Sequence, residues 1–275
     1  MLTIAAFSSC SAKKDVVVAH RGAWKKNNLP ENSIASLRHA IDLKLAGSEF
    51  DVWRTADDSL VINHDAHYNK LLIEETKYED LLQFKLSNGE KLPTLHEYIT
   101  EGKRNNKHTL LVCEIKPSEI SKERGRETAL KAVETIKKLK ADKITGYISF
   151  DYEILKQIRQ VDPKTSLQYL EGNKSPSTVK LDRISGIDYH YSFFQKHPEW
   201  IKVAKDNNII LNVWTVNDPE VMDWIISTVF MAVSFPLSLL ISEGFISHTN
   251  KVFLLFFLPS VIYSCKVGSF SPSKA

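Results

Sequence analysis

Short apolar runs alternate along the chain with longer stretches in which apolar residues recur at helical spacing. The runs predict strands at residues 16–19, 47–53, 109–116, 146–150, 166–170, 186–191 and 209–216. Helical patterns follow several of them, at residues 34–41, 128–139, 152–161 and 199–206. Strands that alternate with helices in this way indicate βαβ units and a parallel sheet. Seven such strands favour a TIM (β/α)₈ barrel over an open sheet.

One interruption falls early in this pattern. A further short strand at residues 60–62 ends in His64, and the polar, irregular residues 66–92 that follow are predicted to be a small insertion. The regular pattern returns at Thr94, a helix N-cap with Glu97 three residues later.

The end of the chain departs from the barrel pattern. Typical loop lengths place an eighth strand within about a dozen residues of Trp224. Residues 225–275 are instead mostly apolar, and they contain four charged side chains, Glu243, Lys251, Lys266 and Lys274. We therefore expect the last β/α unit to be atypical or missing, the tail being non-homologous sequence, for instance from a shifted reading frame. A membrane anchor is the alternative, although the apolar run at 252–263 is too short to span a bilayer as a helix.

Composition and charge add limits to this picture. A chain of 275 residues, 43% apolar, can bury one large core, which we assign to a single domain at residues 16–224. The net charge of +3 gives no reason to expect a nucleic-acid partner. Three cysteines without metal-ligand spacing argue against a disulfide framework, and Cys113 lies in an apolar run typical of a core residue.

Cys10 has a different setting from the other cysteines. Residues 1–9 are apolar or small, and Ser8-Ser9-Cys10-Ser11 resembles the end of a bacterial lipoprotein signal peptide. We therefore interpret residues 1–15 as a leader with a lipidated Cys10. This interpretation predicts an exported, periplasmic or cell-surface lipoprotein with membrane attachment through Cys10, and the alternative is an ordinary frayed N-terminus.

Charged side chains gather where the predicted strands end. They are His20, Arg21, Glu49, Asp51, His64, Glu114 and Lys116. In a parallel barrel all of these emerge on the C-terminal face. Because three carboxylates that converge repel one another, a cation is needed to keep them ionised together. Oxygen ligands suit Ca²⁺ or Mg²⁺, so the sequence predicts a divalent-cation site at Glu49, Asp51 and Glu114.

The remaining charged groups point to phosphate chemistry. Arg21 and Lys116 beside a bound cation form a site for an anion, for which phosphate is the natural candidate. His20 and His64 supply an acid and a base whose ordinary pKa lies near neutral pH. Each motif alone also fits a solvated strand face or a turn, but together they favour phosphodiester hydrolysis, with the cation offsetting charge on the phosphoryl oxygens.

The motifs as a set resemble those of the glycerophosphodiester phosphodiesterase family between about residues 16 and 224. They are His20-Arg21-Gly22, Glu31-Asn32-Ser33, Glu49-Phe50-Asp51-Val52, His64-Asp65, Glu114-Ile115-Lys116 and Trp214-Thr215-Val216-Asn217. The resemblance implies a TIM barrel, a Ca²⁺ or Mg²⁺ cofactor, and hydrolysis of small glycerophosphodiesters to glycerol 3-phosphate and an alcohol.

The resemblance also implies roles for individual residues. His20 and His64 become the acid/base pair, the three carboxylates hold the metal, and Arg21 and Lys116 contact phosphate. Glu31 is expected to orient the site from behind, and Trp214 to form an apolar wall against the glycerol or the alcohol. Residues 66–92 match the position of the insertion that caps the site in this family, whereas the family's closing strand has no counterpart in the tail.

Several alternatives stay open at this level. The chain could be a phospholipase-type barrel acting on intact lipid, or a non-catalytic product with an unclosed barrel. Attack by the neighbouring glycerol hydroxyl, giving a cyclic phosphate, and direct attack by water are both compatible with the motifs. Neither the head group of the substrate nor the choice between Ca²⁺ and Mg²⁺ can be read from the sequence.

Overall fold

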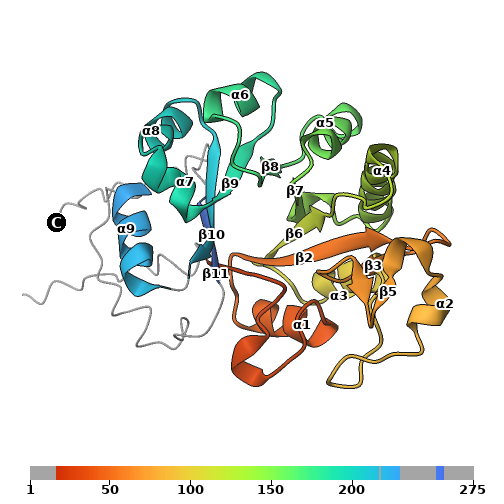
Figure 1. Cartoon of the computed structure of the whole chain (residues 1–275). Helices are drawn as coiled ribbons and strands as arrows, with labels where there is room; N and C mark the ends of the chain where they lie inside the picture. Colours follow the sequence, from red (N-terminus) through yellow and green to blue (C-terminus); the bar gives the residue numbers. More distant parts are fainter. Residues whose placement is uncertain (1–16, 217, 230–251, 257–275) are drawn as a thin grey trace, which may run out of the picture.

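A computed structural model describes residues 17–216, 218–229 and 252–256. Its main feature is a curved parallel sheet of seven strands, in which each strand pairs with the next (Figure 1). These strands are β1 (Val17–Ala19), β2 (Gly47–Arg54), β6 (Leu110–Ile115), β7 (Thr145–Ser149), β8 (Leu167–Tyr169), β9 (Gly186–His190) and β10 (Ile210–Val216). The predicted parallel, TIM-barrel-like sheet is therefore confirmed.

The eighth place in the ring is filled in an unexpected way. Strand β11 (Val252–Phe256), from the apolar tail, pairs with both β10 and β1, and both pairings are antiparallel. The expectation of an atypical last unit is met, but the alternative of an unclosed barrel is wrong for the described residues. Backbone hydrogen bonding does not require one strand direction, so a short apolar run can cover two open sheet edges in either sense.

Helices lie outside the strands, as Figure 1 shows. They are α1 (Ile34–Asp42), α3 (Leu95–Lys103), α4 (Lys122–Lys138), α5 (Tyr152–Val161), α6 (Pro176–Leu181), α7 (Tyr191–Lys196), α8 (Glu199–Asp206) and α9 (Pro219–Val229). Thr94 caps α3 in a reciprocal capping box with Glu97, as predicted. Helix α4 begins earlier than the pattern indicated, because Ser121 rather than a later residue caps its N-terminus. No helix in the described part of the chain is long and apolar enough to cross a membrane.

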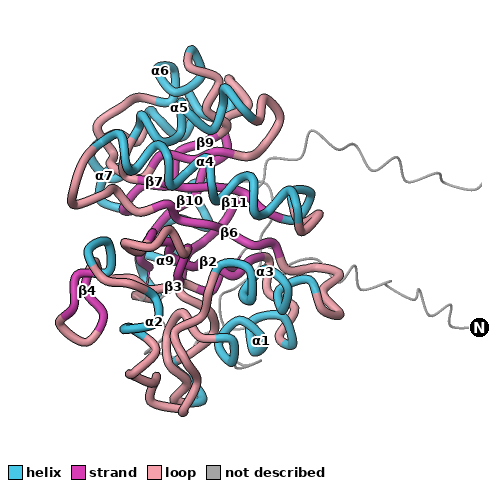
Figure 2. Tube along the Cα trace, turned by 90° about the vertical axis from the view of Figure 1, so that its right-hand side faces the viewer, coloured by secondary structure: helices cyan, strands magenta, loops and turns pink. Residues whose placement is uncertain are grey.

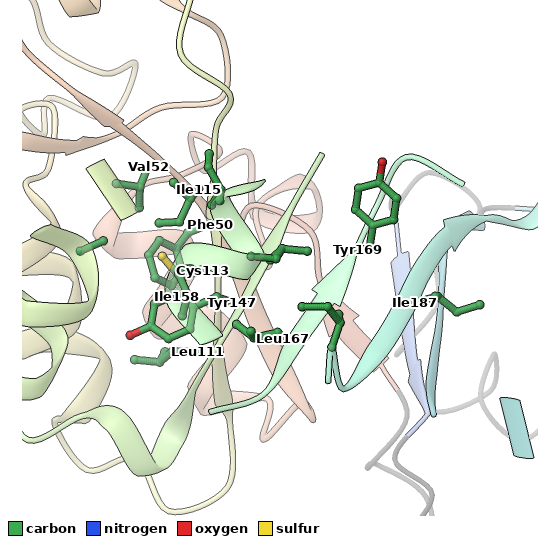
Figure 3. Close-up of a cluster of buried hydrophobic side chains, with 14 of the residues drawn as sticks. Phe50, Val52, Leu111, Cys113, Ile115, Tyr147, Ile158, Leu167, Tyr169 and Ile187 are labelled. Atoms are coloured by element: carbon green, nitrogen blue, oxygen red, sulfur yellow. The ribbon is translucent and has the colours of Figure 1, made fainter. Parts of the chain in front are cut away.

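Two apolar cores flank the sheet. The larger one lies between the strands and the outer helices, where Figure 3 shows Phe50, Cys113 and Tyr147 packed together. A smaller one gathers Val18, Val112 and Ile148 from three strands and Leu170 from directly after β8, and these residues can meet only inside the barrel. Burial of Cys113 confirms its predicted place in the core.

Residues 66–92, predicted to be an insertion, follow β3 (Leu60–Ile62), which pairs antiparallel with β2. This segment contains β4 (His67–Tyr68), β5 (Leu71–Leu72) and α2 (Tyr78–Leu81), and in Figure 2 it lies next to β3 and away from α6. The insertion packs on the barrel through a small shared core, in which Trp53 of β2 and Val61 of β3 meet Tyr68, Ile73, Leu81 and Leu92. The predicted leader, Cys10 and most of the predicted tail lie outside the described residues.

The loop after β1 leaves no room for a side chain at Gly22. A Cβ at this residue would lie 2.3 Å from Ser36 Oγ, and its φ is +79°. Gly89 provides a matched control, because its φ is +86° but nothing lies within 4 Å of an added Cβ. We expect both alanine variants to lose about 1–2 kcal/mol from backbone strain. Gly22→Ala should lose about 1–3 kcal/mol more through the clash.

Denaturant unfolding of the two variants measures this difference. Equal losses of unfolding free energy would contradict the tight packing of the β1 loop against α1.

Candidate active site

Three buried carboxylates form the centre of the site. Glu49 and Asp51 alternate with outward-facing Phe50 on β2, and Glu114 lies on β6 directly opposite Asp51. One oxygen from each carboxylate lies within 4.8 Å of the others. The structure thus brings together the three residues that the sequence assigned to a cation site.

The three carboxyls differ in how readily they ionise. Burial, together with the charges of Asp51 and Glu114, raises the pKa of Glu49 well above its usual value. Burial and the Asp51 charge raise the pKa of Glu114 to about 7. Burial also opposes ionisation of Asp51, but Lys116 and His64 stabilise its charge and its pKa is lowered. Without a cation, the charge on Asp51 is therefore favoured, whereas Glu49 and Glu114 lose their protons at a higher pH than free carboxyls do.

The cluster has acceptor capacity left for a cation. Glu49 Oε2 accepts a hydrogen bond from the Arg21 backbone N–H at 2.8 Å, whereas Glu49 Oε1 is buried without a hydrogen-bond partner among the described residues. An oxygen-only cluster with an unsatisfied buried oxygen fits a hard divalent ion.

Asn32 supports the cluster from the start of α1, a role that the sequence analysis did not assign. Its side-chain amide donates to Asp51 Oδ2 at 2.8 Å and its side-chain oxygen accepts from the Asp51 backbone N–H at 3.3 Å. The available signal was its place in Glu31-Asn32-Ser33, directly before the helix N-cap Ser33.

Two cationic side chains adjoin the carboxylates. Lys116 Nζ lies 2.8 Å from Glu114 Oε1 and 3.2 Å from Asp51 Oδ1. One terminal nitrogen of Arg21 donates to both carboxylate oxygens of Glu31 at 2.9 Å. The structure therefore places Glu31 behind Arg21, where it holds the guanidinium beside the cluster.

The two histidines approach the cluster from different strands. His20 follows β1. Its Nε2 accepts a hydrogen bond from Arg21 Nε at 3.2 Å and lies 3.9 Å from Glu49 Oε2. His64 follows β3, and its Nδ1 lies 2.7 Å from Asp65 Oδ1. Both rings are near enough to Asp51 to favour its charged form and lower its pKa.

Aromatic rings line the opposite side of the barrel mouth. Trp214 on β10 lies edge-on to Phe150 and to His190, with ring centroids 5.7 Å and 5.4 Å apart. Its indole N–H donates to the backbone carbonyl of Asp188 at 2.8 Å. The structure thus places Trp214 beside two aromatic rings, and its role as an apolar wall stays a prediction. Phe150, Asp188 and His190 were not singled out from the sequence. Asp188 and His190 are two residues apart on β9 and therefore share one face of the strand, and that spacing was the signal available.

Two carboxylates of the insertion tie it to the barrel. Glu74 accepts from Ser118 Oγ at 2.8 Å, from the Glu119 backbone N–H at 2.7 Å and from Arg124 Nε at 2.9 Å. Glu90 accepts from two backbone N–H groups in the first turn of α1, at 2.9 Å and 3.2 Å. These contacts anchor the segment after His64 to the segments that follow Lys116 and Arg21.

The raised carboxyl pKa values predict that cation binding releases protons. A cation must displace protons from Glu49 and Glu114, so the affinity for Ca²⁺ or Mg²⁺ should rise as the pH rises through about 7, the pKa of Glu114. Calorimetric titration in two buffers of different ionisation enthalpy measures the release directly. Glu114→Gln should weaken binding and release fewer protons, whereas Glu90→Gln, outside the cluster, should behave as the unmodified chain. Binding that does not depend on pH would contradict the protonation pattern.

Comparison with known proteins agrees with this geometry. A model of the "Glycerophosphoryl diester phosphodiesterase family" matches residues 20–233. A glycerophosphodiester phosphodiesterase of Caldanaerobacter subterraneus is 31% identical over 224 residues, which cover 76% of this chain and 89% of that protein.

Solved structures show the same fold. The crystal structure of a glycerophosphodiester phosphodiesterase from Parabacteroides distasonis has a TM-score of 0.74 and 41% identity, covering 77% of this chain and 88% of that one. An Oleispira antarctica phosphodiesterase, solved with the product sn-glycerol-3-phosphate, has a TM-score of 0.65 and 24% identity, covering 77% and 88%. Together, the family match over residues 20–233 and the relatives covered over most of their length show that this chain belongs to the glycerophosphoryl diester phosphodiesterase family.

Proposed function

We propose that this phosphodiesterase hydrolyses glycerophosphodiesters to glycerol 3-phosphate and an alcohol, using one divalent cation and two histidines. The observation that carries the proposal is the convergence of three buried carboxylates, Lys116, Arg21 and two imidazoles at one barrel mouth. The substrate class is taken from the names of relatives such as the 31% identical Caldanaerobacter protein.

The carboxylates of Glu49, Asp51 and Glu114 would hold the cation, Ca²⁺ or Mg²⁺. When bound, it supplies positive charge that offsets the charge developing on the phosphoryl oxygens. Lys116 and Arg21 bind the non-bridging phosphate oxygens, because both are charged and adjoin the carboxylate cluster. Glu31 keeps Arg21 in place through its paired hydrogen bonds.

The histidines move protons. Because His20 Nε2 accepts a hydrogen bond from Arg21 Nε, the neutral ring carries its proton on Nδ1 and Nε2 is the basic nitrogen. It takes the proton of the attacking hydroxyl when that hydroxyl replaces Arg21 Nε as its hydrogen-bond partner. Asp65 accepts from His64 Nδ1, which leaves His64 Nε2 to give a proton to the departing alkoxide. The attacking group is either the neighbouring glycerol hydroxyl or water, and trapping of a cyclic glycerophosphate would establish the first route.

Loss of either imidazole should abolish turnover without unfolding the protein. We expect His20→Ala and His64→Ala to lower kcat for glycerophosphocholine by about 10²–10⁴-fold, the usual contribution of general acid–base catalysis. Release of glycerol 3-phosphate in a coupled assay measures the loss. His67→Ala, an exposed histidine in the same segment as His64, is the matched control and should retain activity.

Chelation should inactivate the unmodified chain, and added Ca²⁺ or Mg²⁺ should restore it. Retained activity in either catalytic variant would contradict the assigned roles. Turnover of phosphatidyl lipids in micelles in preference to glycerophosphocholine would instead favour a phospholipase-type activity.

We further propose that Cys10 is lipidated and attaches an exported protein to the membrane. The proposal rests on the small residues around Cys10 in the sequence. Labelling with radioactive palmitate in a bacterial host should mark the unmodified chain but not Cys10→Ala. Equal labelling of the two proteins would contradict it.

A further inference from the structure

The order of the strands around the barrel places His190 across from the carboxylate cluster. Around the eight-stranded ring, β2 and β6 occupy the second and third places after β1, and β9 and β10 occupy the sixth and seventh. His190 is the last residue of β9, at the strand's C-terminal end, and its register partner on β10 is Trp214. The ring of His190 therefore belongs to the half of the mouth that the catalytic groups leave unused.

Hydrogen bonds determine which nitrogen of His190 carries its proton. The Ser192 backbone N–H donates to Nδ1 at 3.4 Å, and the Ser192 hydroxyl lies 2.8 Å from the same nitrogen. With Nδ1 accepting, the proton of a neutral ring sits on Nε2. Burial lowers the pKa of His190 and thus favours this neutral form. No hydrogen bond of Nε2 is found within the described residues, so an N–H donor is left for a ligand.

Aromatic rings adjoin this donor, and the carboxyl of Asp188 is buried on the same face of β9. Phe150 and Trp214 pack on the inner core of Val18, Val112, Ile148 and Leu170. The Trp214 indole is held by its hydrogen bond to the Asp188 carbonyl and by edge contacts with both neighbouring rings. Aromatic faces beside one N–H donor suit a hydroxyl on a short carbon chain, because the carbons pack on the rings and the oxygen accepts from the donor.

We propose that His190 Nε2 donates a hydrogen bond to the terminal hydroxyl of the substrate's glycerol unit, whose carbons lie against Trp214 and Phe150. This assignment rests on the proposed function. The glycerol unit is the part that all glycerophosphodiesters share, and a rigid site with one fixed donor suits a constant group better than a variable alcohol. The hydroxyl beside the phosphate stays near the cation half, while the terminal hydroxyl reaches farthest toward β9.

A pair of substrates tests the contact. Glycerophosphocholine and propane-1,2-diol phosphocholine differ only in the terminal hydroxyl, and one lost hydrogen bond should lower kcat/KM by about tenfold for the unmodified chain. His190→Phe removes the donor, so the kcat/KM values for the two substrates should become about equal. His190→Gln keeps an N–H donor and should retain most of the preference. His197→Phe, at a half-buried histidine stacked on Trp200, is the matched control and should keep the full tenfold.

The preference ratio separates recognition from stability, because His190 also caps α7 through Ser192. A His190→Phe variant that slows both substrates equally would show a structural role only and would overturn the proposal. A preference that changes with the alcohol, when choline is replaced by ethanolamine, would move the contact to the leaving group and also overturn it.

Binding provides a readout that does not depend on turnover. Calorimetry should give glycerol 3-phosphate about tenfold higher affinity than propane-1,2-diol phosphate, and His190→Phe should remove the difference. Binding of both ligands without turnover of any glycerophosphodiester would refute the proposed function while still deciding the His190 contact. Equal affinities in the unmodified chain would overturn the contact itself.

Discussion

The burial of three carboxylates within 4.8 Å of one another is the constraint on which the site depends. In a low-dielectric barrel interior such a cluster cannot carry three charges unless cations surround it. Lys116 and the Arg21 backbone N–H supply part of that stabilisation, and Asn32 supports Asp51 directly. The negative charge that these groups leave uncompensated raises the pKa values of Glu49 and Glu114, and it makes the cluster suited to a divalent ion.

The closed ring divides the barrel mouth into two halves of different chemistry. Strands β2 and β6 present charge, while β7, β9 and β10 bring together the aromatic rings of Phe150, His190 and Trp214. A phosphodiester joins a charged centre to carbon-bearing groups, and it requires such a division. The insertion, held by Glu74 and Glu90, fixes the segment after His64 relative to the loops that follow β6 and β1.

Much of this arrangement follows from local patterns. The alternation of Glu49, Phe50 and Asp51 assigns both carboxylates to one face of a strand, because successive side chains of a strand point to opposite sides. The apolar runs predicted all seven parallel strands, and Thr94 with Glu97 predicted the start of α3. The sequence was less informative for α6 and α7, since each has only six residues and too little periodicity to be distinguished from a loop.

The sequence alone determined the strand faces, the capped start of α3 and the set of charged residues at strand ends, because these depend on neighbours a few positions apart. Only the tertiary structure decided that β11 closes the ring antiparallel, that Glu31 holds Arg21, and that His190 lies against Trp214. Those contacts depend on strand register and ring closure between distant segments. The same residues in another register would face different neighbours, so their partners cannot be read from local spacing.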